Sequence, residues 1–230
     1  MRERVIQLWD LPVRLFHWAL LALVAGSVIS VNIGSNSAMV WHGRFGHLIL
    51  ALLVFRIVWG VIGSTHARFH HFVRGPRAVF AYLRGRWRGV GHTPLGALSV
   101  LALLLLLAAL AVTGLFANDA IAFRGPLYPL AGADLSDRLT TWHRRGEWVL
   151  YGLVTLHVLA ILYYAVIRRD NLILPMITGR KRVSNPAARS FQGGGMLPFM
   201  IALAAAAAAF WVAGGGLLPP PPPPAPDLGF

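Results

Sequence analysis

Apolar residues fall into long runs along this chain, and most charged residues lie in the segments between them. A helix needs about 20 apolar residues to cross the hydrocarbon core of a bilayer. Four runs meet this length: residues 11–31, 39–62, 95–116 and 143–167. A fifth run, residues 196–218, is rich in alanine, and a proline run at 219–224 follows it as an extended tail. The pattern predicts an all-α transmembrane helical bundle with a four-helix core and a fifth, C-terminal span.

The composition also favours a membrane protein. The chain has 230 residues, of which 57% are hydrophobic and only 13% are charged, whereas a soluble domain has about 25% charged residues. The net charge of +13 would suggest a nucleic-acid partner in a soluble protein. Here the arginines lie in short segments between apolar runs, as topology signals do, so we expect the lipid bilayer and no nucleic acid as a partner.

Basic residues are distributed unevenly between the segments that join the runs. They are frequent before the first run, after the second run and after the fourth run. Residues 31–40 contain none, and residues 119–142 contain two arginines offset by three aspartates. Because lysine and arginine mark the cytoplasmic side of short segments, the distribution predicts a multi-pass protein with a cytoplasmic N-terminus.

Five of the nine histidines lie in or at the ends of predicted spans, where an ionisable side chain is costly and is a functional candidate, and four of them match in depth. These four are His17, His42, His143 and His157. His143 and His157 are 14 residues apart, so they lie on one helix face about 21 Å apart along the axis. In the predicted topology His17 and His157 share the inner depth, and His42 and His143 share the outer depth. Imidazoles on facing helices are axial ligands of haem iron.

The spacing therefore predicts two molecules of haem b, each with two histidine ligands, held by His17/His157 and by His42/His143. The chain has no cysteine, which excludes disulfides, iron–sulfur clusters and covalently attached c-type haem. With both axial positions of each iron filled by protein, the pattern favours electron transfer over substrate chemistry.

Arg56 follows His42 by 14 residues and lies on the same face of the second span. We expect its guanidinium to meet a haem propionate near the inner haem. The alternative is that Arg56 extends to the inner headgroups. Further candidates at the outer haem are Arg44, Arg144 and Arg145 as propionate partners, and Gly46 and Gly114 as positions that leave room for a flat macrocycle or a neighbouring helix.

The other histidines are expected to have plainer roles. His47 is about 140° around the helix from His42, so a structural role is predicted. Contact with solvent or headgroups is predicted for the histidines of the segment after the second span: His66, His70, His71 and His92.

The chain resembles the bacterial b-type cytochrome family that includes cytochrome b561 and the cytochrome b subunit of nickel-iron hydrogenases. The resemblance covers about residues 5–180, and its motifs are specific when taken together. The matching stretches are WDLPVRLFHW at 9–18, WHGRFG at 41–46, RIVWG at 56–60, GSTHARF at 63–69, GHTPLGAL at 91–98, TGLF at 113–116, residues 143–157 and PMITG at 175–179.

The resemblance implies a four-helix haem-binding core, with ligands at His17, His42, His143 and His157. It also implies a bacterial inner-membrane protein that moves electrons between a redox partner, such as a hydrogenase-like enzyme or cytochrome c, and a quinone. The predicted organisation is a dihaem membrane domain at 1–180, a cytoplasmic basic linker at 181–195, an extra transmembrane helix at 196–218 and a proline-rich tail at 219–230.

Two other functions compete with an electron-transfer subunit or carrier. One is a self-contained quinol, ferric or superoxide oxidoreductase, so the sequence leaves open whether the chain is itself an enzyme. The other is a metal-ion transporter, which is disfavoured because the sequence contains no visible broken or repeated pair of spans. An absorption spectrum separates the transporter from the other two.

Overall fold

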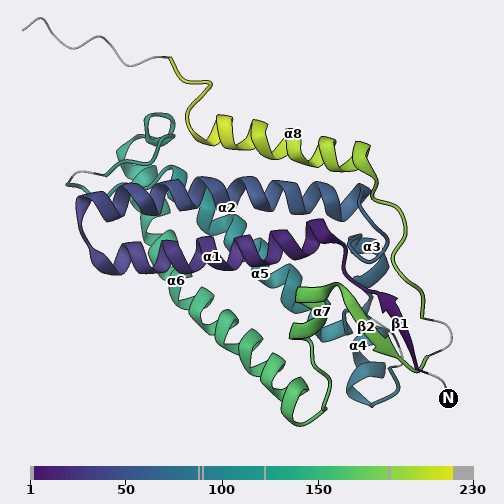
Figure 1. Ribbon diagram of the computed structural model, residues 1–230. Helices are drawn as coiled ribbons and strands as arrows, with labels where there is room; N and C mark the ends of the chain where they lie inside the picture. Colours follow the sequence, from purple (N-terminus) through teal and green to yellow (C-terminus); the bar gives the residue numbers. More distant parts are fainter. Residues whose placement is uncertain (1–2, 88, 90, 122, 186–187, 220–230) are drawn as a thin grey trace, which may run out of the picture.

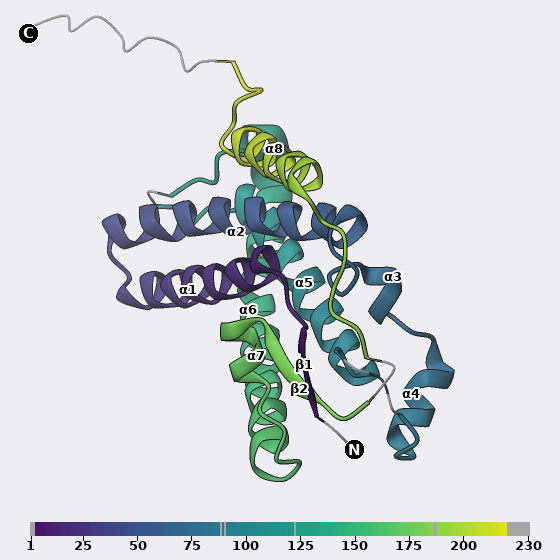
Figure 2. The same ribbon diagram turned by 45° about the vertical axis from the view of Figure 1, so that its right-hand side comes forward.

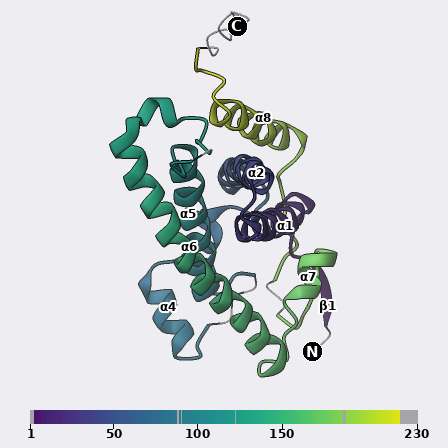
Figure 3. The ribbon, with the colours of Figure 1, turned by 90° about the vertical axis from the view of Figure 1, so that its left-hand side faces the viewer.

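Five helices of the computed structural model, which describes residues 3–87, 89, 91–121, 123–185 and 188–219, are long and apolar enough to cross a membrane. They are α1 (Leu11–Ile33), α2 (Asn36–Ile62), α5 (Pro94–Leu115), α6 (Tyr128–Val166) and α8 (Met196–Ala213). Figure 1 shows α1 and α8 running along opposite sides of α2. Figure 3 shows the α5–α6 pair beside α1 and α2. The predicted all-α transmembrane bundle is confirmed.

Short elements gather at one end of the bundle, which we call the inner end (Figure 2). They are α3 (Phe69–Phe72), α4 (Pro76–Leu83), α7 (Ile173–Thr178), β1 (Arg4–Gln7) and β2 (Arg180–Val183). The two strands form an antiparallel pair, with Arg4 opposite Val183. Ser64, after α2, pairs with Gly193, before α8. The three basic segments of the sequence therefore lie together.

The buried carboxylate of Asp10 joins α1 to α2 at the inner end. Its Oδ1 accepts a hydrogen bond from the Val13 amide at 2.7 Å and caps the first turn of α1. Its Oδ2 accepts hydrogen bonds from Trp59 Nε1 at 3.0 Å, and from the hydroxyl of Ser64. One side chain thus fixes the start of α1 against the end of α2.

Helix α6 begins earlier than the sequence analysis predicted. The predicted fourth span started at residue 143, whereas α6 starts at Tyr128 and bends at Gly132, whose φ is 69°. The added turns are polar, and buried Ser136 donates a hydrogen bond to the carbonyl of Phe116 at 2.7 Å. The predicted start was wrong because hydropathy detects the hydrocarbon core, and a helix that continues into water gives no apolar signal.

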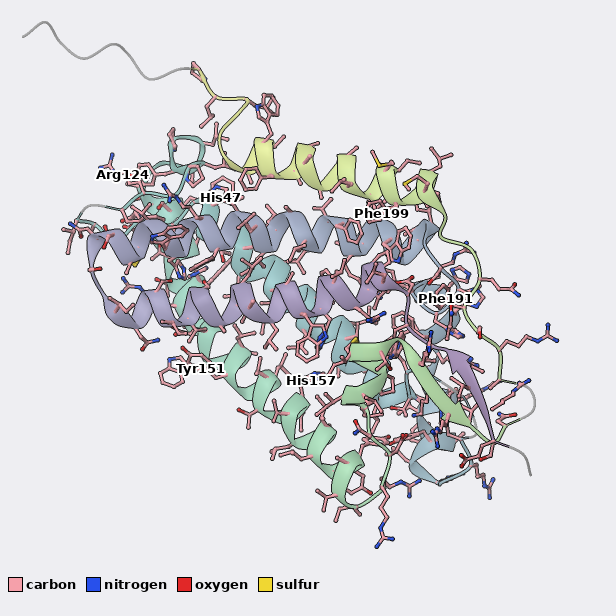
Figure 4. The ribbon with its side chains drawn as sticks, viewed as in Figure 1. His47, Arg124, Tyr151, His157, Phe191 and Phe199 are labelled. Atoms are coloured by element: carbon pink, nitrogen blue, oxygen red, sulfur yellow. The ribbon has the colours of Figure 1, made fainter. Side chains whose placement is uncertain are left out.

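Helix α8 packs along α2 through small side chains. Ala202, Ala206 and Ala213 are buried, which lets the two helices approach closely. Phe199 packs at 5.8 Å, between ring centres, against Phe55 of α2 (Figure 4). The helix ends at Ala213 and not at residue 218, because the glycines that follow it favour turns.

We predict that the inner end of the bundle is cytoplasmic. Because the chain has no cysteine, single cysteines can report the side of each segment. We expect Arg77→Cys and Arg180→Cys, both at exposed positions, to react with a membrane-impermeant maleimide only after spheroplasts are permeabilised. Asp134→Cys, exposed in the outer part of α6, should react in intact spheroplasts. The opposite pattern would refute the orientation, and labelling of positions 77 and 180 from different sides would refute the fold.

We also predict that Asp10 is essential to stability. Asp10→Ala removes a helix cap and leaves the Trp59 and Ser64 donors unpaired, at a cost of about 3 kcal/mol. The melting temperature of the detergent-solubilised protein should fall clearly, while that of the control Asp134→Ala, at an exposed aspartate, stays close to the parent value. Equal melting temperatures for the two variants would contradict this role.

Candidate functional site

His42 of α2 and His143 of α6 come together at the outer end of the bundle. Their ring centres are 5.9 Å apart and the ring planes are nearly perpendicular, at 85°. Two imidazoles that bind one metal ion through bonds of about 2 Å have ring centres roughly 6 Å apart. The spacing of these rings therefore fits two ligands on opposite sides of a single ion.

In each of these two rings, Nδ1 already lies within hydrogen-bond distance of a backbone carbonyl. Nδ1 of His42 lies 3.1 Å from the Ser27 carbonyl, and Nδ1 of His143 lies 2.9 Å from the Leu110 carbonyl. A neutral imidazole that donates its Nδ1 hydrogen to a carbonyl keeps a lone pair on Nε2, which is the arrangement of metal-bound histidines. The chemistry of both side chains therefore suits axial ligands.

A cavity of about 350 Å³ surrounds the outer pair. Gly46 lines this cavity, and a Cβ atom added there would meet nothing within 4 Å. Gly114 also lines it, but there a Cβ would lie 3.1 Å from Cε1 of His143. Gly46 thus keeps the cavity wall open, while Gly114 makes room for the histidine ring.

Of the three arginines predicted beside the outer site, the structure brings only Arg144 to the cavity. Arg44 lies over the Trp41 ring, 4.8 Å from its centre, in a groove between α2 and α8. Arg145 is exposed and does not line the cavity. The prediction for these two is corrected for one physical reason: each is two residues from a pairing histidine, about 200° around the helix.

His47 faces α8. Its Nδ1 lies 2.6 Å from the Gly43 carbonyl and its Nε2 lies 3.1 Å from the Ala213 carbonyl. Figure 4 shows His47 beside the end of α8. The Gly43 contact lies within α2, whereas the Ala213 contact ties α8 to α2, which is a structural role.

His17 of α1 and His157 of α6 form the inner pair. Their imidazoles are close enough to interact electrostatically, and Figure 4 shows His157 between α6 and α1. Nδ1 of His17 is buried, and it has no hydrogen-bond partner among the residues that the structure describes. His157 is 14 residues after His143 on α6, so the two pairs are separated by about 21 Å along that helix.

Arg56 lies at the inner end, buried and only 3% exposed. Its guanidinium carbon is 4.7 Å from the centre of the Phe69 ring. Its Nη1 has no hydrogen-bond partner among the described residues. An unpaired buried donor is costly, so the position calls for an acceptor. The alternative, in which Arg56 extends to the headgroups, does not describe a guanidinium that is covered by Phe69.

The sequence predicted that His92 contacts solvent or headgroups, but it is only partly exposed and packs among aromatic rings. His70 and His71 are exposed as expected, but the His92 ring lies 4.6 Å from Trp9 and 4.3 Å from Phe72, between ring centres. Burial, with smaller effects of Arg56 and His66, lowers the pKa of His92 to about 3. Its place in the GHTPLGAL stretch was the only signal, because the segment's arginines suggested a solvated loop.

A bundle of membrane-length helices that brings two histidines together in its interior is typical of a multi-pass membrane haem protein. The chain belongs to the prokaryotic cytochrome b561 family, which matches residues 8–179. The match ends before α8 begins at Met196. The chain is therefore a membrane b-type cytochrome of electron transfer whose cofactor is haem b, and the resemblance found in the sequence is confirmed.

Similar proteins bear names from the same family. A relative from Azotobacter vinelandii is 27% identical over 77% of this chain and 89% of its own length, and one from Cupriavidus necator is 26% identical over 74% and 84%. A relative from Rhodobacter capsulatus is 24% identical over 78% and 82%. All three are named as probable Ni/Fe-hydrogenase B-type cytochrome subunits. No solved structure matches the chain significantly.

Proposed function

We propose that this chain is a dihaem cytochrome that carries electrons across the bacterial inner membrane, between a partner redox protein and the quinone pool. The observation that carries the proposal is the outer histidine pair, because its 5.9 Å ring separation and its two carbonyl-bound Nδ1 atoms suit one iron. The inner pair, at matched depth on α1 and α6, supplies the second site.

Each haem in this proposal has two histidine ligands, His42 and His143 at the outer end and His17 and His157 at the inner end. An iron with both axial positions filled changes oxidation state but has no open position for a substrate. The protein then holds each iron and tunes its potential. This favours an electron carrier over a self-contained quinol, ferric or superoxide oxidoreductase.

The proposed partners follow from the sidedness of the chain and from its relatives. The relatives' names refer to Ni/Fe-hydrogenase, so a hydrogenase-like enzyme is the first candidate for a redox partner, and a cytochrome c is the second. Electrons that cross between two haems at opposite depths link an enzyme at one membrane surface to a quinone at the other. Co-purification with a tagged chain, followed by mass spectrometry, identifies the partner.

The proposal predicts two haems per chain with defined pairing. His42→Ala and His143→Ala should each remove the outer haem, and His17→Ala and His157→Ala the inner one, because each iron loses one of its two protein ligands. Pyridine haemochrome analysis of folded protein measures the loss, which should be half of the parent haem. Exposed His71→Ala is the matched control and should keep both haems.

Haem content of one or none in the parent protein would refute the dihaem proposal. Redox titration shows which haem remains in each variant, so a shared loss in His17→Ala and His42→Ala would refute the pairing. Rapid reduction of ferric iron or superoxide by the purified chain, with added quinol as the electron donor, would instead favour the self-contained oxidoreductase.

We further propose that Arg56 tunes the inner haem without binding its iron. A guanidinium stays charged under all relevant conditions, and a nearby positive charge stabilises the electron-rich ferrous state. Arg56→Gln should therefore keep haem bound and lower one midpoint potential. A tenfold fall in the ferrous-to-ferric ratio at fixed potential is about 59 mV for one electron. Arg44→Gln, at an exposed position on the same helix, is the control. Two unshifted potentials would contradict a tuning role.

A further inference from the structure

Among the described residues, four buried side-chain nitrogen atoms have no hydrogen-bond partner, in Arg14, His17, Arg56 and His92. Two of these four side chains pack against the same group of aromatic rings at the inner end. Their unpaired atoms are Nη1 of Arg56 and Nδ1 of His92. The two side chains come from different segments, α2 and the turn before α5. They are close enough that the charge of Arg56 acts on His92. Two unpaired nitrogen atoms on neighbouring side chains favour an acceptor that both can reach.

Aromatic rings hold the two side chains in position. The Phe69 ring covers Arg56 at 4.7 Å, and the Phe72 ring lies 5.7 Å from Phe69 and 4.3 Å from His92. Gly60 makes this arrangement possible, because a Cβ atom there would lie 2.1 Å from Phe69. The donors are therefore set in an apolar wall, where water competes little for their hydrogen bonds.

The depth of Arg56 on α2 is close to that of the inner histidines. Asp10 contacts Trp59, so these two residues mark one level of the antiparallel helices α1 and α2. His17 is seven residues from Asp10, about 10 Å deeper, and Arg56 is three residues from Trp59, about 4.5 Å deeper. Arg56 therefore lies about 6 Å to the inner side of the His17 level.

We propose that Arg56 and His92 form a carboxylate-binding site, and that its occupant is a propionate of the inner haem. The inference rests on the proposed function and adds His92 as a positioning residue that orients the macrocycle. A carboxylate oxygen accepts from the guanidinium, and a second acceptor position meets the imidazole N–H. A charged acceptor makes such bonds stronger than neutral ones. The low pKa of His92, about 3 without an anion, leaves a neutral imidazole with one hydrogen to donate.

The test combines a protein variant with a cofactor variant. His92→Phe keeps a ring against Trp9 and Phe72 but removes the donor, and His92→Gln keeps a donor. Full-length apoprotein of each is titrated with haem b and with its dimethyl ester, which has no free carboxylate. We expect His92→Phe to lose about tenfold in affinity for the second haem b, with partial rescue in His92→Gln. The ester should bind parent and variant equally. His70→Gln, at an exposed position, should match the parent.

The outcomes separate the inference from the function on which it rests. A parent protein that binds fewer than two haems refutes the proposed function. A parent that binds two, with an equal loss for haem b and the ester in His92→Phe, refutes carboxylate recognition and makes His92 a packing residue. An unchanged haem b affinity in both His92 variants likewise refutes the inference. If the donors instead hold a lipid phosphate, haem binding is unchanged and anionic vesicles protect only the parent from heat.

Discussion

A carboxylate buried among apolar helices is stable only if its oxygens are hydrogen-bonded, and Asp10 meets this condition in a way that sets the geometry of the bundle. Its partners are the first turn of α1, the indole of Trp59 and the hydroxyl of Ser64. These hydrogen bonds therefore fix how far the antiparallel helices α1 and α2 are shifted relative to each other along their axes. That shift decides how deep His17 lies relative to Arg56, and how the outer end of α2 presents His42 to α6.

The membrane is the reason that so much could be predicted from the sequence. Hydrocarbon thickness fixes the number of apolar residues in a span, and helix pitch converts residue number into depth. The 14-residue spacing of His143 and His157 therefore corresponds to about 21 Å of depth in the membrane. Because successive spans alternate in direction, the start of the second span and the start of the fourth lie at the same depth, which predicts that His42 lies near His143. The structure brings that pair together at 5.9 Å.

The features that could not be predicted depend on contacts outside the hydrocarbon core or on rotation around a helix. The outer turns of α6 are held by Ser136 and are too polar to be detected by hydropathy. Arg44 has the right depth but the wrong face, and stacks on Trp41 instead. His92 enters the interior only because β1, α3 and the turn before α5 converge at the inner end, and no local pattern encodes that convergence.

The pairing of β1 with β2 has a consequence for the order of events during synthesis. Strand β1 precedes all the helices in the chain, and it can pair with β2 only after both Gln7 and Arg180 have been synthesised. At about 5–20 residues per second, the interval between Gln7 and Arg180 lasts about 9–35 s. Because β2 follows α6 in the chain, the inner end closes only after the last of the four histidines has entered the membrane. The β1–β2 pair can therefore form only after both histidines of each proposed pair have been synthesised.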